Sequence, residues 1–373
     1  MLRRDFIRVV GGGMILATAG CGAAGPDPRA AWEAPGERET DPRRRALAFA
    51  ILAPNPHNMQ PWLADLSVPD TVTLFVDRTR LLPATDPFNR QIVIGCGAFL
   101  ELLRLAAGEQ GMATAITPFP DGEPADHLDD RPIARIAFSP GGARDPLFGQ
   151  ALQRRTNRGR YQARMVAAGA VQPLAQVVGT DLTFGAVTEG PRLALLRSMV
   201  FEGAEIEAHT PTAHRESVDR TFIGARAVAA NRYGISLEGP GIEAAHAAGL
   251  LTRARMADPA SWAFGQEIAV MKAGAESAGG FVWLTTPGNS RAEQLAAGRA
   301  YVRVNLAATG EGLSMQPWSQ GLQEYASMAG LFERLHRELA PGGGRLQMLA
   351  RIGYAKPVPP APRRGLAFNL KEG

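Results

Sequence analysis

Short runs of apolar and β-branched residues along this chain are separated by longer segments in which apolar residues recur at helical spacing. The short runs predict strands, because Val, Ile, Phe and Thr favour the half-buried surface of a sheet. The longer segments predict two helices, over residues 97–108 and 291–309, with small and apolar residues suited to close packing. The strands are expected at residues 72–76, 133–138, 281–285 and 349–354. This mixture predicts an α+β fold.

An internal repeat relates the two halves of the chain. Leu105-Ala106-Ala107-Gly108-Glu109-Gln110-Gly111-Met112 matches Leu306-Ala307-Ala308-Thr309-Gly310-Glu311-Gly312-Leu313 at a constant offset of 201 residues. Each copy ends a helical pattern with a glycine where a C-terminal cap is expected, and each is followed by a proline, Pro118 or Pro317. The repeat predicts two related lobes fused in one chain.

The composition along the chain divides it further. We expect a first lobe over residues 46–147 and a second over residues 148–355, with a mainly helical insertion at about 195–274 that has no counterpart in the first lobe. Residues 22–45 are rich in Pro, Gly and charge and are expected to be a linker. Residues 356–373 contain too many prolines for a helix, so we expect an extended arm that could wrap the other lobe.

The N-terminus, Met1-Leu2-Arg3-Arg4-Asp5-Phe6, is followed by a short and mildly apolar run and resembles a twin-arginine export signal. We therefore assign residues 1–21 to targeting and expect a periplasmic or other extracytoplasmic protein. Two forms of processing stay open. Cleavage after Ala19 would release a soluble protein, whereas lipidation of Cys21 would tether it to a membrane.

Charge and cysteine content exclude several functions. Three arginines and one aspartate in residues 3–8 carry half of the formal net charge of +4, so the remainder is near neutral. Basic residues are neither clustered with aromatic residues nor aligned on one helix face, and no nucleic-acid partner is expected. The two cysteines are Cys21 and Cys96, and Cys96 is expected to be a small buried residue. The scattered histidines predict no metal site.

Two motifs far apart in sequence carry candidate chemistry. The first, Pro54-Asn55-Pro56-His57-Asn58-Met59-Gln60-Pro61-Trp62, places amide side chains in a proline-rich corner after a helical run. The second, Arg154-Arg155-Thr156-Asn157-Arg158, offers guanidinium and amide groups that suit a phosphorylated cofactor. Trp62 is expected to pack in the core, and His57 to make a hydrogen bond within the corner.

With these motifs, residues 45–365 resemble the nitroreductase superfamily, and within it the Acg-type proteins in which two nitroreductase-like lobes are fused. The resemblance implies FMN at the interface between the lobes, an intramolecular counterpart of a homodimer interface. Because the corner motif lies only in the first lobe and the arginine motif only in the second, we expect one FMN per chain and a monomer.

The resemblance also implies roles for particular residues. Arg154, Asn157 and Arg158, completed by Arg363 or Arg364, would hold the phosphate and ribityl chain, and Pro54, Asn55 and Asn58 would lie against the isoalloxazine edge. Gln60 is a candidate for the cofactor site that could equally hold the backbone of the corner, and the backbone N–H of Ser319 or Gln320 would point at flavin N5. Arg226, Asn231 and Tyr233 are candidates for contacts from the insertion.

The implied activity is that of an exported FMN-dependent oxidoreductase that accepts electrons from NAD(P)H or another donor. No acid, base or nucleophile in the sequence is assigned to catalysis, since flavin chemistry requires the protein chiefly to position and desolvate. The alternative is an FMN-binding or flavin-sequestering protein, in which the insertion acts as a lid that covers the flavin and prevents turnover with NAD(P)H.

Overall fold

Two long helices form the centre of the molecule. The computed structural model describes residues 27–371, and within it α3 (Arg90–Glu109) packs along α11 (Arg291–Gly310). Both helices end within one residue of the predicted position. Helix α3 begins seven residues earlier than expected, so its first turns contain β-branched residues that the helical pattern had left out. Of the described helices α3 is long and apolar enough to cross a membrane, yet 89% of its apolar window is buried in the protein. Its apolar character reflects its central position.

The first lobe is built on a four-stranded antiparallel sheet. Its strands are β1 (Trp62–Asp65), β2 (Thr71–Val76), β3 (Met112–Pro118) and β4 (Ala134–Pro140), in the order β1-β2-β4-β3. Side chains of β4 alternate between buried and exposed, with Ala134, Ile136 and Phe138 buried. This sheet therefore has one face in the core and one toward solvent.

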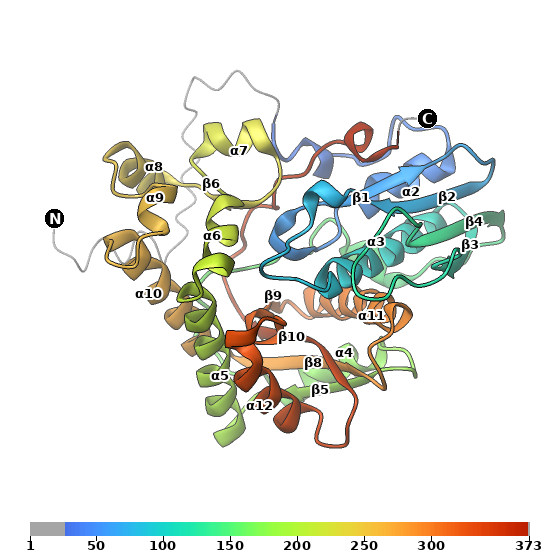
Figure 1. Cartoon of the computed structure of the whole chain (residues 1–373). Helices are drawn as coiled ribbons and strands as arrows, with labels where there is room; N and C mark the ends of the chain where they lie inside the picture. The colour runs from blue at the N-terminus through green and yellow to red at the C-terminus, as the bar shows by residue number, and fades with distance from the viewer. Residues whose placement is uncertain (1–26, 372–373) are drawn as a thin grey trace.

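The second lobe repeats this order of strands. β5 (Thr183–Val187), β8 (Gly280–Thr286), β9 (Ser314–Pro317) and β10 (Arg345–Gly353) form an antiparallel sheet in the order β5-β8-β10-β9. Every residue of β8 is buried, because α11 packs on one face of the sheet and α5 (Gly190–Ala208) and α12 (Ala329–Leu339) pack on the other. The expectation of an α+β chain with two related lobes is confirmed (Figure 1).

Glycines bring the two central helices into contact. A Cβ atom added to Gly97 would lie 2.1 Å from the carbonyl oxygen of Leu295, and one added to Gly298 would lie 1.9 Å from that of Ile94. Both glycines and both carbonyls are related by the offset of 201 residues that relates the sequence repeats. An approximate two-fold axis therefore passes between Gly97 and Gly298.

Arginines at the start of the two central helices each donate hydrogen bonds to the opposite lobe. Arg90 donates to the carbonyl oxygens of Leu322 (2.7 Å) and Gln347 (2.9 Å) in the second lobe. Arg291, again 201 residues later, donates to those of Phe88 (2.8 Å) and Asp126 (2.9 Å) in the first lobe. Both arginines are buried, so these carbonyl oxygens provide the acceptors that their guanidinium groups cannot obtain from water.

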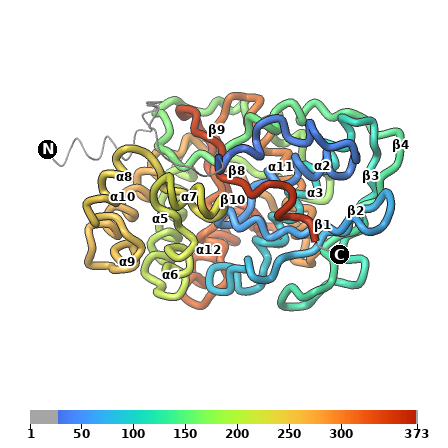
Figure 2. The backbone as a smooth tube through the Cα atoms, turned by 90° about the horizontal axis from the view of Figure 1, so that it is seen from above, coloured from blue at the N-terminus to red at the C-terminus, as the bar shows by residue number. Residues whose placement is uncertain are grey.

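A helical insertion lies between β5 and β8, where the first lobe has only a turn. It contains α5, α6 (Pro211–Asp219), β6 (Thr221–Ile223), α7 (Ala225–Asn231), β7 (Ile235–Leu237), α8 (Pro240–Ala247), α9 (Arg253–Met256) and α10 (Trp262–Glu276). We call residues 190–276 the lid. The lid stands to one side of the lobes and meets the first lobe near α6 and α7 (Figures 1 and 2).

The described part of the expected linker is folded against the body, which corrects that expectation. Asp41 caps α2 (Pro42–Ala50) by accepting from the backbone N–H of Arg43, and Trp32 is buried in the core of the first lobe. Trp32 donates its Nε1–H to the carbonyl oxygen of Ala361, so the C-terminal segment holds it in place. The targeting segment and Cys21 lie outside the described residues.

The C-terminal segment is extended and crosses back over the first lobe (Figure 2). Leu370 forms a parallel bridge with Ala64, and the backbone N–H of Lys371 donates to the carbonyl oxygen of Ala64 at 2.9 Å. The backbone N–H of Arg363 donates to the carbonyl oxygen of Pro28 at 2.9 Å. We call residues 354–371 the arm.

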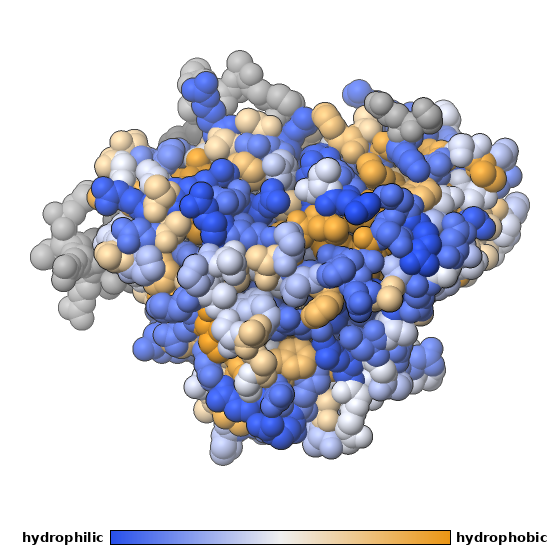
Figure 3. All heavy atoms as spheres, viewed as in Figure 1, coloured by the Kyte–Doolittle hydropathy of each residue, from blue (hydrophilic) through white to orange (hydrophobic). Residues whose placement is uncertain are grey.

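The surface is mostly hydrophilic on the face seen in Figure 1, with apolar residues reaching it near its middle (Figure 3). Charged residues make up 20% of the sequence, and scattered apolar residues on the surface are usual for a folded protein.

Candidate functional site

A cavity of about 470 Å³ lies where the corner, the central helices, the arginine motif, the loop after β9 and the lid meet. Its volume is in the range of small-molecule sites. Five of the residues predicted from the sequence line it: Pro54, Asn55, Arg158, Ser319 and Gln320. The cavity is thus lined by both lobes, as the resemblance implied for the cofactor.

The corner itself has an unusual backbone. His57, Asn58 and Gln60 have φ angles of 47°, 53° and 52°, in the left-handed region that non-glycine residues rarely occupy. Asn55 holds this conformation, since its Oδ1 accepts from the backbone N–H of Gln60 at 2.8 Å and its Nδ2 donates to the carbonyl oxygen of Ala53 at 3.0 Å. Strain of this kind is typically found at functional sites, where the surrounding structure imposes it.

Asn58 and Gln60 face away from the cavity, which corrects the expectation that Asn58 lies at the isoalloxazine edge. Nδ2 of Asn58 donates to the carbonyl oxygens of Gly234 in the lid (3.2 Å) and Pro362 in the arm (3.0 Å). Nε2 of Gln60 donates to the carbonyl oxygen of Arg232 at 3.0 Å. These amides join the corner to the lid and the arm, and Gln60 holds the corner instead of lining the cavity.

Arg363 and Arg364 are also directed away from the cavity. Arg363 donates to the carbonyl oxygens of Ile51 and Ala53, both at 3.0 Å, and Arg364 donates to that of Gln60 at 2.8 Å. Burial lowers the pKa of Arg363 well below its usual value. The carbonyls lie at the C-terminal end of α2, where a cation is favoured by the helix dipole. In this structure both arginines hold the corner rather than a phosphate.

Arg154 and Asn157 of the arginine motif are buried behind the cavity wall. Arg154 donates to Oδ1 of Asn305 (3.2 Å) and to the carbonyl oxygen of Leu52 (3.0 Å). Nδ2 of Asn157 donates to the carbonyl oxygen of Lys356 at 2.9 Å. Their contacts connect the lobes and the arm, so the expected contacts with a ribityl chain are not provided by this arrangement.

Arg158 differs from these arginines because its side chain is exposed and lines the cavity. Among the described residues no ion pair or hydrogen bond is recorded for its guanidinium. The surrounding protein lowers its pKa by desolvation, although the side chain has accessible surface within the cavity. Arg158 therefore presents an uncompensated positive charge to anything that enters.

Tyr301 on α11 lines the same cavity and has a buried hydroxyl with no partner among the described residues. Burial raises the pKa of this phenol, so it is a neutral donor at physiological pH. A buried hydroxyl without a partner is costly, and a ligand acceptor would satisfy it. Arg158 and Tyr301 together suit an anionic or strongly polar ligand group.

The loop after β9 forms the opposite wall. Trp318 is buried and donates its Nε1–H to the carbonyl oxygen of Val200 at 2.8 Å, which fixes the loop to α5. Ser319 Oγ donates to Oε1 of Gln91 on α3 at 3.2 Å, and Ser319 and Gln320 both line the cavity. The contact expected between flavin N5 and the backbone N–H of Ser319 or Gln320 remains a prediction. Trp318 holds the loop that carries both residues in place.

A hydrogen-bonded chain on the lid side was not found from the sequence. Nε2 of His57 lies 2.9 Å from Oγ of Ser217 on α6, and Oγ of Ser217 lies 2.6 Å from Oε1 of Glu207 on α5. Nε2 of Gln323 donates to Oε2 of Glu207 at 3.0 Å. All four residues line the cavity. His57 bonds to the lid rather than within the corner, which corrects the expectation for it.

The lid residues that the sequence suggested are placed elsewhere. Asn231 donates to the carbonyl oxygen of Ala227 within α7, and the ring of Tyr233 packs edge-on against Phe222. Neither they nor Arg226 are among the residues that line the cavity. The surface of α6 and α10, not α7, covers the cavity.

Other candidate features are structural. Cys96 is buried in the core of the first lobe, and burial raises the pKa of its thiol to about 12. Trp62 is buried and packs on Phe99 with ring centroids 5.1 Å apart. Within residues 27–371 no group of three His, Cys, Asp or Glu side chains could hold a metal ion. These placements agree with the expectations for Cys96 and Trp62.

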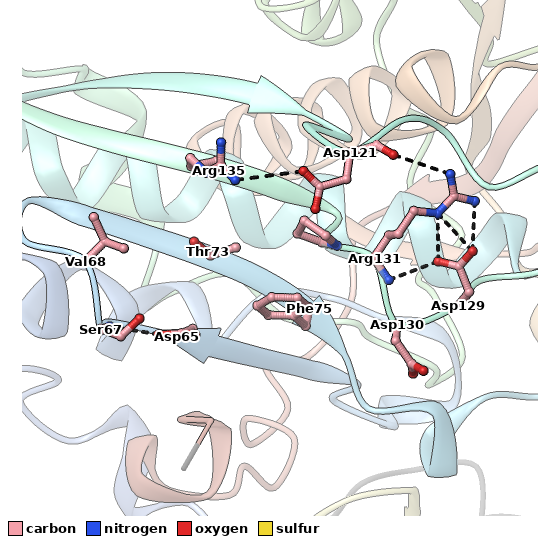
Figure 4. A pocket seen from close by; sticks show the side chains of 11 residues that line it. Asp65, Ser67, Val68, Thr73, Phe75, Asp121, Asp129, Asp130, Arg131 and Arg135 are labelled. Atoms are coloured by element: carbon pink, nitrogen blue, oxygen red, sulfur yellow. Dashed lines mark hydrogen bonds and ion pairs between the residues drawn. The ribbon is translucent and has the colours of Figure 1, made fainter. Parts of the chain in front are cut away.

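A second hollow, of about 940 Å³, lies on the outer side of the first-lobe sheet (Figure 4). Its charges pair with one another: Arg131 contacts Asp129 at 2.8 Å and Arg135 approaches Asp121 at 3.9 Å. None of the residues that line it belongs to either sequence motif. We therefore assign the site to the cavity between the lobes.

Comparison with known proteins places the chain among relatives with a provisional name. No family model matches the chain. Rv3131 of Mycobacterium tuberculosis H37Rv, provisionally named an NAD(P)H nitroreductase, is 27% identical over 334 residues, which are 87% of this chain and 89% of the relative. The acg protein of the same strain, also provisionally named an NAD(P)H nitroreductase, is 39% identical over 101 residues, 27% of this chain and 29% of its own.

Among solved structures, the FMN- and NADPH-dependent nitroreductase NfnB from Sphigopyxis sp. strain HMH aligns with 61% of this chain and 99% of its own, with a TM-score of 0.38 and 17% identity. The sequence relationship to the Rv3131 protein extends over most of both chains, which supports a place for this α+β chain in the nitroreductase superfamily.

Proposed function

We propose that this protein binds one FMN in the cavity between the lobes and acts as an oxidoreductase of the nitroreductase type. The observation that carries the proposal is that Arg158 and Tyr301 present an unpaired charge and an unpaired hydroxyl to a cavity lined by both lobes. FMN supplies an anionic phosphate and several polar acceptors that would satisfy both groups. When bound, FMN would supply hydride and electron transfer at N5.

The chain's own residues bind, orient and exclude water. Arg158 would attract the anionic part of the cofactor, Tyr301 would donate a hydrogen bond, and Pro54 and Asn55 would provide a rigid edge. Ser319 and Gln320 would bring backbone donors from a loop anchored by Trp318. The complete motif Asn-Met-Gln-Pro-Trp occurs in the first lobe alone, because Ser314 precedes the Met-Gln-Pro-Trp of residues 315–318, so one site per chain in a monomer is the expected stoichiometry.

A second candidate is favoured by the bonds between lid and corner. His57 bonds to Ser217, Asn58 to the carbonyl oxygen of Gly234, and Gln60 to that of Arg232. In this closed arrangement the lid occupies the side from which a nicotinamide would approach. The protein would then hold FMN and exchange electrons with a smaller or different donor, without turnover with NAD(P)H.

The test is an absorbance spectrum of the natively purified protein before and after anaerobic addition of excess NADPH. Flavin present at one per chain and bleached by NADPH supports the oxidoreductase. Flavin that bleaches with dithionite but not with NADPH supports the lidded binding protein. A colourless protein that takes up no FMN on addition contradicts both. The same sample on a calibrated sizing column tests the monomer.

We propose in addition that the protein is exported by the twin-arginine route, on the strength of Arg3-Arg4 and the apolar run that follows. Replacement of Arg3 and Arg4 by lysine should leave the protein in the cytoplasmic fraction, whereas Arg8→Lys should not. Equal distribution of all three forms between fractions contradicts the proposal. Labelling with a radioactive fatty acid that disappears in Cys21→Ala would select lipidation over plain cleavage.

A further inference from the structure

The chain of polar groups from His57 into the lid ends at a carboxyl group that is removed from bulk solvent. Glu207 is buried, and both of its oxygens accept hydrogen bonds, from Ser217 Oγ (2.6 Å) and from Gln323 Nε2 (3.0 Å). Gln323 in turn accepts from the hydroxyl of Tyr325 at 2.7 Å. Among the described residues, no arginine or lysine forms an ion pair with Glu207. An unpaired buried carboxyl of this kind is costly to ionise, so it retains a proton readily, and the protonated group would donate to Ser217 Oγ instead of accepting from it.

The other end of the chain reaches the cavity. Nε2 of His57 lies 2.9 Å from Ser217 Oγ, and no hydrogen-bond partner is recorded for Nδ1 within the described part of the protein. His57 sits at the corner beside Pro54 and Asn55, which the proposed function places at the edge of the flavin. Serine can accept one proton and pass on another, and imidazole can do the same between its two nitrogens. The three residues therefore form an unbroken hydrogen-bonded path along the cavity wall, from Glu207 to the corner.

We propose that Glu207, Ser217 and His57 form a proton-transfer chain that protonates the electron acceptor in this cavity, with His57 as the residue that touches it. The inference rests on the proposed function, because the acceptor requires a reduced flavin as its source of electrons. The acceptor class is a quinone or nitroaromatic compound, whose reduction consumes protons.

For a quinone the atoms and electrons balance as follows. Conversion to the hydroquinone takes two electrons and two protons, and a hydride from the reduced flavin accounts for both electrons and one proton. His57 transfers its Nδ1 proton to the quinone oxygen, Ser217 transfers its hydroxyl proton to His57 Nε2, and Glu207 transfers its carboxyl proton to Ser217 Oγ. His57 is left as the Nε2–H tautomer and Glu207 as the carboxylate, which recovers its proton by the reverse transfers.

The surroundings of these three residues favour a protonated Glu207 and a neutral His57. Burial raises the pKa of Glu207, with Glu267 of α10 acting in the same direction and the bonds from Ser217 and Gln323, with His214 of α6, opposing it. Burial lowers the pKa of His57 to about 4, with Arg158 and Arg220 adding to the effect. His57 thus stays neutral while it relays a proton, and Glu207 is the group that gains and loses it.

A purely structural role has to be separated from proton transfer, because the same bonds join the lid to the corner. Glu207→Gln keeps an oxygen that accepts from Ser217 but cannot release a proton. Glu216→Gln is the matched control: Glu216 is the neighbour of Ser217 on α6 and accepts from the backbone N–H groups of Ala84 and Thr85, at 3.1 and 2.9 Å, but does not line the cavity. Ser217→Ala and Ser217→Thr remove and keep the hydroxyl.

The first readout does not depend on activity. With ¹⁵N-labelled histidine, and the His57 signals assigned by their loss in His57→Asn, the two ring nitrogens should exchange protonated and unprotonated character as pH crosses the titration of Glu207. Glu207→Gln should fix the Nε2–H tautomer at every pH, and Glu216→Gln should behave as the wild type. A single pH-independent tautomer in the wild type overturns the proposal.

The second readout uses the FMN-loaded protein, reduced with one equivalent of dithionite and mixed anaerobically with menadione or ferricyanide. Ferricyanide accepts an electron without a proton. Glu207→Gln and Ser217→Ala should slow oxidation by menadione at least tenfold and change oxidation by ferricyanide less than twofold, while Ser217→Thr restores most of the menadione rate. Equal slowing with both acceptors, or no slowing with menadione, overturns the chain. Failure of the wild type to bind FMN or react with ferricyanide counts against the proposed function itself, and the NMR result still decides the connection between Glu207 and His57.

Discussion

Gly97 and Gly298 face each other where α3 crosses α11, so closely that a Cβ atom added to Gly298 would lie 2.9 Å from the Cα of Gly97. The same atom would lie 1.9 Å from the carbonyl oxygen of Ile94. Real Cβ atoms do not approach a backbone oxygen to this distance, and a helix backbone cannot yield as a flexible side chain would. The contact between the lobes thus depends on both glycines.

Gly298→Ala should therefore destabilise the protein by at least about 3 kcal/mol, because the helices must separate to admit the methyl group. Gly330→Ala is the control, since Gly330 lies exposed on α12 with no atom within 4 Å of an added Cβ. It should leave the free energy of unfolding unchanged or slightly raised. Urea titration of both variants measures the difference, and equal stability would refute the role assigned to the crossing.

Arg158→Ala should weaken FMN binding by about tenfold to a hundredfold, because a charge-assisted contact is worth about 1.5 to 3 kcal/mol. Arg160→Ala changes an exposed arginine two residues away that does not line the cavity. Its dissociation constant should stay within about twofold of that of the wild type, within the scatter of surface substitutions. Fluorescence titration of apoprotein with FMN gives both constants, and an unchanged affinity for Arg158→Ala removes this residue from the site.

The neutral state of His57 predicts a pH dependence of stability. Its pKa in the folded protein is about 4, below the usual 6.5, so as pH falls from 6.5 toward 4 the unfolded chain takes up a proton that the folded chain does not. Stability is lost over this interval and the contribution levels off below it. Between pH 7 and pH 5 the loss from this residue is up to about 2 kcal/mol.

Urea titrations at pH 7 and pH 5 test this dependence. His57→Asn should lose less stability than the wild type between the two values, by the amount attributed to the imidazole. His127→Asn, at an exposed position in the first lobe, should follow the wild type. If all three proteins lost the same free energy of unfolding between pH 7 and pH 5, the pKa of His57 would be the same in the folded and unfolded states.

Arg363→Met should destabilise the protein by about 3 kcal/mol, because it removes the buried donor to the carbonyl oxygen of Ile51 and one of the two donors to those of Leu52 and Ala53. Arg363→Lys should restore at most half of the loss, since an ammonium group lacks the planar fork that reaches all three. Lys356→Met, at an exposed position of the same arm, is the control. Thermal unfolding compares them, and full rescue by lysine would mean that charge alone matters.

The fold was largely predictable because its signals are local or repeated. The copies at 105–112 and 306–313 predicted two lobes, and the apolar runs predicted β2, β4, β8 and β10. The strands β1, β5 and β9 are too short to show an alternating pattern of apolar and polar residues. They form because neighbouring strands of the sheet pair with them. The folding of residues 27–45 depends on Trp32 meeting the arm, which no local pattern indicates.

The site was predictable in part. The motifs indicated which loops would meet, and Pro54, Asn55, Arg158, Ser319 and Gln320 do line one cavity. A guanidinium group, however, suits a phosphate and a helix end equally, so sequence could not separate Arg158 from Arg363 and Arg364. Glu207 and Ser217 lie on separate helices of the lid, about 150 residues from His57, and only tertiary packing joins them to it.

The bonds of Arg363 and Arg364 to the corner set an order of events in the life of the molecule. Residues 51–60 leave the ribosome early, but the groups that hold them in shape are more than 300 residues farther along the chain. The binding corner therefore reaches its final form only after residues 363 and 364 have been made. A cofactor that needs the finished corner binds after that point, and any export of the loaded protein has to wait for it too.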